Sequence, residues 1–280
     1  MLEDARKHIR LVHLDPAVAF EDPIVCTLST AAIDGQGHFE TLSYCWGDEH
    51  DLRPMMLNGS EYFITKNLES ALRHLRLVDK KRIFWIDSIS INQADDEEKS
   101  EQVQQMGRIF SASSKVVIWL GRACEDDDTW SIEVDDALLQ KALVLARSLR
   151  VAYETFWHDD PFRWARYLEE QTQDLKLAPA SDNDPAGQIT AVLINLLGRP
   201  WFTRMWVIQE AHIHPLAPEV VIGFSSAQLV DFTYTAHYIA LMEDFRTKKI
   251  RPTRTRLPLP AVSNARYALC FSTSGLSGIV

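Results

Sequence analysis

The sequence contains two groups of polar side chains, each at the end of an apolar run. The first group consists of Ser43, Tyr44, Trp46 and Gly47, and the second consists of Asp87, Asn92 and Gln93. Ligands of open parallel sheets bind at the carboxyl edge, because loops leave the layers there and backbone groups become available. A hydrogen-bond network that only holds the loop explains the second group equally well, since polar groups near a core must be satisfied either way. We expect both groups to converge on one concave site at this edge.

A run of acids, Asp95, Asp96, Glu97 and Glu98, follows the second group. Asp95 is predicted to cap a helix that ends at Phe110, with Glu98 three residues later as the partner in a capping box. Acids favour the first turn of a helix because its N-terminus carries partial positive charge. The acids therefore need no catalytic role, and we expect those beyond the cap to lie on the wet face of the helix.

Apolar runs bounded by turn residues alternate with segments of helical period. Strands are predicted at 24–29, 39–44, 83–86, 116–120 and 220–223, and helices at 67–77, through Phe110, at 136–150, at 189–197, and from a cap at Ser225 or Ser226 toward Met242. Asn58-Gly59 predicts a β-hairpin between 55–57 and 61–64, because both residues tolerate positive φ. Continuous apolar strands separated by helices indicate an α/β fold with a mainly parallel sheet.

Composition and charge exclude several classes of function. The formal net charge is −10, which disfavours the basic surface of a nucleic-acid-binding protein. No stretch approaches the roughly 20 apolar residues of a membrane span, and the first 15 residues do not resemble a signal peptide. The 4 cysteines show no tight ligand spacing, which favours reduced thiols over a disulfide framework or a zinc site. We therefore expect a cytoplasmic protein that contacts neither nucleic acid nor membrane.

Other groups of residues are weaker candidates for a metal site or a catalytic site. Glu210, His212 and His214, like the segment 158–160, place possible metal ligands close together, but the spacing does not support a zinc site. Ser43 lacks the GxSxG setting of a hydrolase nucleophile, and no glycine-rich phosphate loop is present. The acidic run 125–128 is interpreted as a solvated loop. We expect no bound metal.

Four segments in order resemble the motifs of the fungal heterokaryon-incompatibility (HET) domain. They are TLSYCWGD (41–48), FWIDSISINQ (84–93), EQVQQMGRIFSASSKVVIWLG (101–121) and RPWFTRMWVIQEA (199–211). The segments IRLVHLDP and PEVVIGFSSAQLVDF resemble that family's flanking regions. The resemblance assigns residues 1–246 to a HET domain, with core motifs at 39–232, and leaves 247–280 as a basic, proline-containing linker and tail.

The resemblance implies a role in fungal nonself recognition and regulated cell death. HET domains are considered similar to TIR domains, which implies a flavodoxin/TIR-like sheet flanked by helices. Some TIR domains cleave NAD at the nicotinamide–ribose bond with a glutamate, and the similar segment MWVIQEA points to Glu210. By this analogy Arg204 and Trp206 help to form the pocket of Glu210, and NAD is a substrate rather than a cofactor. A salt bridge from Glu210 to Arg204 or Arg199 is the structural alternative.

Two functions from different classes stay open on the sequence alone. The first is an NAD-consuming hydrolase that triggers death by depleting its substrate. The second is a noncatalytic signalling module that acts by self-association or by binding another incompatibility protein.

Overall fold

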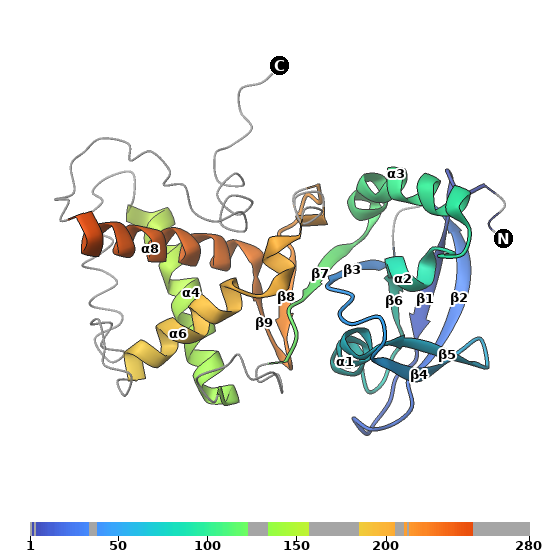
Figure 1. The fold of residues 1–280 in the computed structure, drawn as a ribbon, viewed down its shortest axis with the longest axis horizontal. Helices are drawn as coiled ribbons and strands as arrows, with labels where there is room; N and C mark the ends of the chain where they lie inside the picture. Colours follow the sequence, from blue (N-terminus) through green and yellow to red (C-terminus); the bar gives the residue numbers. More distant parts are fainter. Residues whose placement is uncertain are drawn as a thin grey trace, which may run out of the picture. The chain divides into compact units, whose positions relative to one another are not determined.

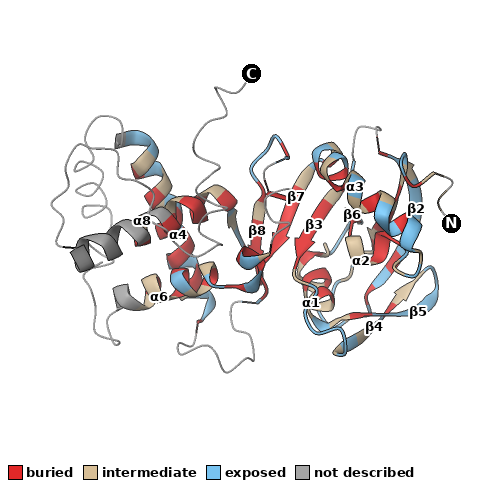
Figure 2. Ribbon diagram, turned by 45° about the horizontal axis from the view of Figure 1, so that its top comes forward, coloured by how far each residue is buried: buried red, intermediate tan, exposed pale blue. Residues whose placement is uncertain are grey.

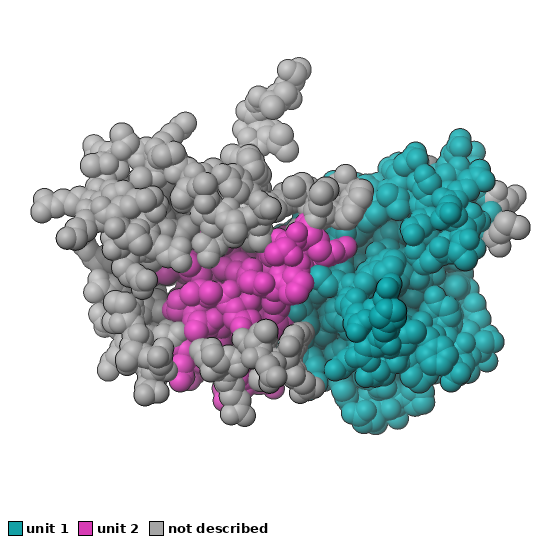
Figure 3. Space-filling model, in the orientation of Figure 1, with its two compact units in different colours: residues 1–122, 205–226 teal, residues 123–204, 227–280 magenta. Residues whose placement is uncertain are grey.

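The structure is a computed structural model that describes residues 2, 4–33, 38–122, 134–156, 185–204, 210–211 and 213–248. The chain divides into two compact units (Figure 3). Unit 1 comprises residues 1–122 and 205–226, and unit 2 comprises residues 123–204 and 227–280. The polypeptide therefore leaves unit 1 after Arg122 and returns to it at residue 205.

A nine-stranded sheet in the order β5-β4-β2-β1-β6-β3-β7-β8-β9 forms the framework of unit 1 (Figure 1). The strands are β1 (His8–Leu14), β2 (Val25–Ala32), β3 (Glu40–Tyr44), β4 (Leu52–Leu57), β5 (Ser60–Thr65), β6 (Arg82–Trp85), β7 (Lys115–Trp119), β8 (Glu219–Ile222) and β9 (Ser225–Gln228). Unit 1 ends within β9, at Ser226. The run β6-β3-β7-β8 is parallel throughout, whereas β1 pairs antiparallel with both β2 and β6. The predicted α/β fold and the parallel pairing of the strands near 39–44, 83–86 and 116–120 are confirmed.

Helices cover both faces of the parallel strands. Helix α1 (Lys66–Leu75) buries Leu68, Ala71, Leu72 and Leu75, the stripe expected of an amphipathic helix, in one core cluster with Leu42 and Tyr44 of β3. On the other face, the ring of Phe110 in α3 (Asp96–Ala112) lies 6.0 Å from that of Trp85. Adjacent strand residues point to opposite faces, so β3 offers Tyr44 to the α1 side and Ser43 to the α3 side. The short helix α2 (Asp87–Ser90) follows β6 directly.

The described part of unit 2 is helical. It contains α4 (Asp136–Phe156), α6 (Pro185–Leu197), the 3₁₀ helix η1 (Pro200–Thr203) and α8 (Leu229–Lys248). The guanidinium of Arg150 in α4 donates to the buried carboxylate of Asp231 in α8 at 2.6 Å. The ring of Phe202, next to Trp201 in η1, packs on Phe232 with 6.2 Å between centroids. An ion pair therefore joins α4 to α8, and an aromatic contact joins η1 to α8.

Several sequence expectations need correction or lie outside the described residues. The sequence analysis assigned no strand to 8–14, which forms β1 at the centre of the antiparallel flank. Ser225 and Ser226 do not cap the last helix but belong to β9, and α8 begins at Leu229. The acidic run 125–128, the predicted turn at 34–37 and the tail 249–280 lie outside the described residues. Among the described residues, none of the helices has the length and apolarity needed to span a membrane.

Candidate functional site

The ends of β3 and β6 are joined through both polar groups singled out in the sequence. The indole Nε1 of Trp46 donates to Oδ2 of Asp87 at 2.9 Å. The hydroxyls of Tyr44 and Ser88 lie 2.7 Å apart. Because β3 and β6 are parallel neighbours, their carboxyl ends meet at one edge of the sheet. We call Tyr44, Trp46, Asp87 and Ser88 the edge cluster; Trp46 in this cluster is 42% exposed.

The other two residues of the second polar group hold the loop that follows α2. Gln93 donates from Nε2 to the carbonyl of Asp87 at 3.0 Å. The side-chain oxygen of Asn92 accepts from the backbone N–H of Ala94 at 3.2 Å. The sequence analysis gave two explanations for the second polar group, ligand contact or a hydrogen-bond network that holds the loop. These bonds are of the second kind.

Asn67 fixes the loop that carries Trp46, and the sequence analysis missed it. Its Nδ2 donates to the carbonyl of Cys45 at 2.6 Å, and its Oδ1 accepts from the indole Nε1 of Trp119 at 2.9 Å. Gly47 has φ +80°, and a Cβ there would lie 3.4 Å from the Cβ of Asn67. The Trp46 loop therefore packs against α1 through Asn67. The sequence analysis identified Asn67 only as the first residue of a predicted helix.

Ser43 and Glu210 form a separate pair on the opposite side of β3 from Tyr44. The Ser43 hydroxyl donates to Oε2 of Glu210, although the two residues are 167 positions apart. Both residues are only 2% exposed. The structure thus divides the predicted site between the edge cluster, in which Trp46 is exposed, and a buried Ser43–Glu210 pair.

The structure does not test two of the residues predicted to line the pocket of Glu210. Arg204 follows η1 as its C-cap and belongs to unit 2, and Trp206 lies outside the described residues. Their roles stay predictions.

A buried ion pair positions the start of α3 and corrects the predicted capping box. Asp95 accepts from the backbone N–H of Glu98 at 3.1 Å, as expected of an N-cap. The Glu98 carboxylate, however, does not return to Asp95 and does not face water. It accepts from both terminal nitrogens of Arg10 at 2.5 and 2.8 Å, and from the N–H of Asn92 at 2.8 Å. Arg10 also donates to the carbonyl of Ser90 at 3.0 Å, so β1, α2 and α3 meet at this pair.

The pairing changes the titration of Glu98. The hydrogen bonds from Arg10 hold the pKa of Glu98 below its ordinary value, against the opposing effect of burial. The same bonds raise the pKa of Arg10. No local signal in the sequence connects residue 10 with residue 98, so the partner of Glu98 was not foreseen.

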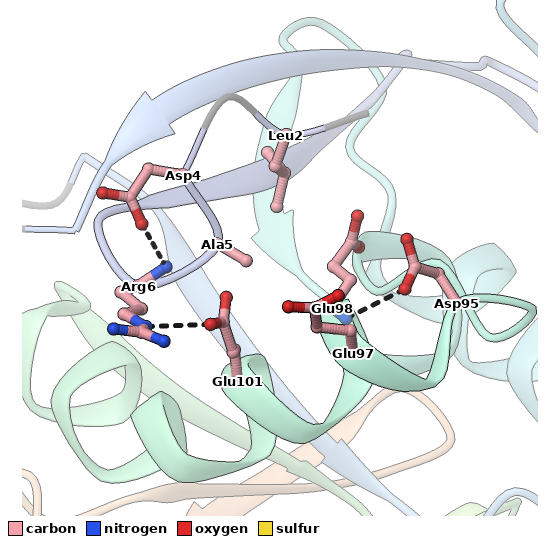
Figure 4. A pocket seen from close by; sticks show the side chains of 8 residues that line it. All are labelled: Leu2, Asp4, Ala5, Arg6, Asp95, Glu97, Glu98 and Glu101. Carbon is pink, nitrogen blue, oxygen red and sulfur yellow. Dashed lines mark hydrogen bonds and ion pairs between the residues drawn. The ribbon is translucent and has the colours of Figure 1, made fainter.

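An acid-lined cavity of about 330 Å³ lies beside this ion pair (Figure 4). Its lining consists of Leu2, Asp4, Ala5, Arg6, Asp95, Glu97, Glu98 and Glu101. Arg6 donates from Nε to Glu101 at 2.8 Å and neutralises part of the acidic lining.

The described residues contain no group of three or more His, Cys, Asp or Glu side chains that could hold a metal ion. Of the candidates considered in the sequence, His214 is buried and its ring contacts the backbone. Its Nδ1 accepts from the N–H of Leu216 at 3.1 Å, and its Nε2 lies 2.9 Å from the carbonyl of Ser113. His212 and the segment 158–160 lie outside the described residues.

Comparison with known proteins matches the family described as "Heterokaryon incompatibility protein (HET)" over residues 39–210, more than half of the chain. The curated protein "Heterokaryon incompatibility protein 6, OR allele" of Neurospora crassa is 40% identical over an alignment of 229 positions, and the alignment covers 75% of this chain and 32% of that protein. The chain therefore spans about a third of that relative's length. No solved structure matches. The matched range contains the edge cluster, Ser43 and Glu210, and we conclude that the chain belongs to the heterokaryon-incompatibility (HET) family.

Proposed function

We propose that this chain acts in heterokaryon incompatibility, as an effector of a nonself response that ends in cell death. The membership in the HET family and the name of the Neurospora crassa relative support this role. Within it, we propose that Glu210 cleaves NAD at the nicotinamide–ribose bond, with NAD as substrate, no cofactor, and the cytoplasm as the compartment.

Cleavage of this bond places its main demand on the ribose. Nicotinamide leaves as a neutral molecule from a cationic pyridinium, so the leaving group needs little acid assistance. Positive charge develops on the ribose as in glycoside cleavage generally, and a nearby carboxylate stabilises it. A water molecule completes the hydrolysis by adding to the ribosyl cation and losing a proton, and a single well-placed glutamate can stabilise that cation.

The hydrogen bond between Ser43 and Glu210 is the observation that carries the proposal. It shows a carboxylate with an alcohol donor within a nearly closed environment. Ribose hydroxyls are donors of the same type, so a bound ribose would replace the Ser43 hydroxyl without leaving Glu210 unsatisfied. Electrostatic stabilisation by a carboxylate is also stronger where water is excluded.

The exposed indole of Trp46 supplies a candidate face for the cationic nicotinamide or the adenine ring. Its Nε1 is held by Asp87 and its loop by Asn67, so the ring is fixed before any ligand arrives. A cation over a tryptophan face is favourable. The edge cluster is therefore proposed to bind substrate, together with Gly47, Asn92 and Gln93.

The test is release of nicotinamide from NAD by the purified full chain at several protein concentrations. Glu210→Gln keeps the shape and removes the charge, so we expect the rate to fall by about 10²-fold or more. The control is Glu49→Gln, a change of the same type at an exposed position. A folded Glu210→Gln protein with the parental rate would refute the assignment, as would an inactive wild type at every concentration.

The burial of Glu210 favours a second candidate function. A side chain that is 2% exposed reaches substrate only after its surroundings change. A noncatalytic module that acts by self-association, or by binding another incompatibility protein, requires no such change. Inactivity of wild-type protein both as a monomer and when assembled would select this candidate.

A further inference from the structure

His214 is a buried titratable residue that the proposed reaction does not use. It is 8% exposed and lies four residues after Glu210. Its Nε2 lies 2.9 Å from the carbonyl oxygen of Ser113, and this nitrogen carries the proton because a carbonyl oxygen only accepts. Its Nδ1 lies 3.1 Å from both the backbone nitrogen and the carbonyl oxygen of Leu216. Backbone groups therefore hold both nitrogens of the ring.

Ser113, which accepts from His214, is itself fixed to the rest of unit 1. It is the C-cap of α3, and its hydroxyl donates to a carbonyl of the last turn of that helix at 2.8 Å. The same hydroxyl lies 3.4 Å from that of Thr41. Thr41 and Ser43 lie in the buried part of β3 (Figure 2), and their side chains point to the same face because they are two residues apart. The His214–Ser113 bond therefore reaches the end of α3 beside the face of β3 that carries Ser43.

An apolar contact also attaches the segment that follows Glu210. A Cβ on Gly107 of α3 would lie 3.3 Å from Cδ1 of Ile213, which is tighter than most contacts of a Cβ atom. Ile213 therefore lies directly against the backbone of α3, where glycine leaves room for it. The segment is thus attached at three places, by a carboxylate, an apolar side chain and an imidazole.

These three attachments differ in what happens to them when substrate binds. In the proposed reaction a ribose hydroxyl replaces the Ser43 hydroxyl at Glu210, so the fold loses this bond at the moment when the carboxylate must be in place. The contacts of Ile213 and His214 involve no group that the substrate replaces. A carboxylate stabilises developing charge best when its position is set in advance.

We propose that His214 is a positioning residue for Glu210. Through its bond to Ser113, it keeps the Glu210 carboxylate against β3 once the Ser43 hydroxyl has been displaced. The catalytic meaning of this inference rests on the proposed cleavage of NAD. The positioning itself is present in the free protein, where the Ser43–Glu210 bond depends on it.

The experiment measures the coupling between His214 and Ser43 in urea unfolding of the full chain. Ser43→Ala is introduced into wild type and into His214→Leu, and the two shifts of the unfolding midpoint are compared. His214→Leu should already weaken the Ser43–Glu210 bond, so we expect the shift caused by Ser43→Ala to shrink by about half or more. Residues with independent structural roles give additive effects. A Ser43→Ala shift of the same size in both backgrounds overturns the proposal.

Three variants separate the hydrogen bond of His214 from its bulk. His214→Gln carries an amide nitrogen near the position of Nε2, so the full Ser43→Ala shift should return, and a shift as small as in His214→Leu would contradict the proposal. If the leucine variant does not fold, His214→Asn replaces it with the same expectation, because its shorter amide ends before the position of Nε2. The matched control is His50→Leu, at a position whose side chain is 87% exposed, which should leave the Ser43→Ala shift unchanged.

Nicotinamide release from NAD gives a second readout. In an active wild type, His214→Leu should lower kcat by about tenfold or more and change KM by less than about threefold, because the contact acts on the carboxylate and not on the substrate. A folded His214→Leu protein with the parental kcat refutes the positioning role. A wild type that releases no nicotinamide refutes the proposed cleavage alone, and the urea comparison still decides whether His214 positions Glu210.

Discussion

At the scale of single residues, the Ser43–Glu210 hydrogen bond is the feature with the clearest energetic consequence. Ser43→Ala removes one donor from a buried carboxylate, so we expect the free energy of unfolding to fall by about 1–3 kcal/mol. Urea unfolding of both proteins measures the difference. Ser100→Ala, at an exposed position of α3, is the control and should stay within about 0.5 kcal/mol of wild type. Equal midpoints for Ser43→Ala and wild type would show that the bond does not stabilise the fold.

At the scale of elements, the Arg10–Glu98 pair joins β1 to α3 and makes their packing depend on pH. The pKa of Glu98 is depressed in the folded state, so its contribution to stability is present above the ordinary value of 4.5 and is lost as the pH falls through the folded-state pKa. At pH 7, Glu98→Gln should cost about 3 kcal/mol, because Arg10 is left without its anion. That cost should shrink on acidification toward pH 3.

Chemical denaturation at several pH values between 7 and 3 measures this prediction. The matched control is Glu97→Gln, a neighbouring acid on the exposed side of the helix, which should differ little from wild type at any pH. A Glu98→Gln cost that does not change with pH would mean that Arg10 is not the source of the depressed pKa.

The elements also show which parts of the structure local sequence can predict. The β4–β5 hairpin follows from Asn58-Gly59, and α1 buries the four residues whose spacing predicted a single buried face. Both predictions depend only on residues that are close together in the sequence. The predicted cap at Ser225 or Ser226 was wrong because β9 takes these residues into the sheet, a tertiary requirement that outweighs capping preference.

The sequence predicted that the ends of β3 and β6 meet at one edge of the sheet, and not how the side chains there are arranged. The pairing of Trp46 with Asp87 follows from two parallel strands that end at one edge, which sequence reasoning anticipated. Ser43 and Tyr44 face opposite sides of the sheet because side chains alternate along β3. Resemblance alone singled out Glu210, and its pairing with Ser43 was not predicted. Arg10 and Asn67 were missed because their partners are 88 and 52 positions away and have no signature in sequence.

At the scale of the whole molecule, unit 1 is discontinuous in sequence and needs residues 205–226 to complete its sheet. A fragment that ends at Arg122 lacks β8 and leaves the apolar strand β7 unpaired on one side. We expect residues 1–122 to aggregate, because an exposed flat apolar edge recruits other strands. Residues 1–248 should yield more soluble protein, because this fragment keeps β8, β9 and α8. Soluble yield and circular dichroism compare the two, and a folded, monomeric 1–122 fragment would contradict the expectation.

The same discontinuity sets an order of events during synthesis. Roughly a hundred residues separate the end of β7 from the last residue of unit 1, so at about 5–20 residues per second the ribosome needs roughly 5–20 s to deliver the rest of the sheet. During that interval β7 lacks its parallel neighbour β8, while the helices of the second unit are still being synthesised. The nascent chain is therefore open to capture by chaperones, and Glu210 meets Ser43 only after the segment between the two parts of unit 1 has been made.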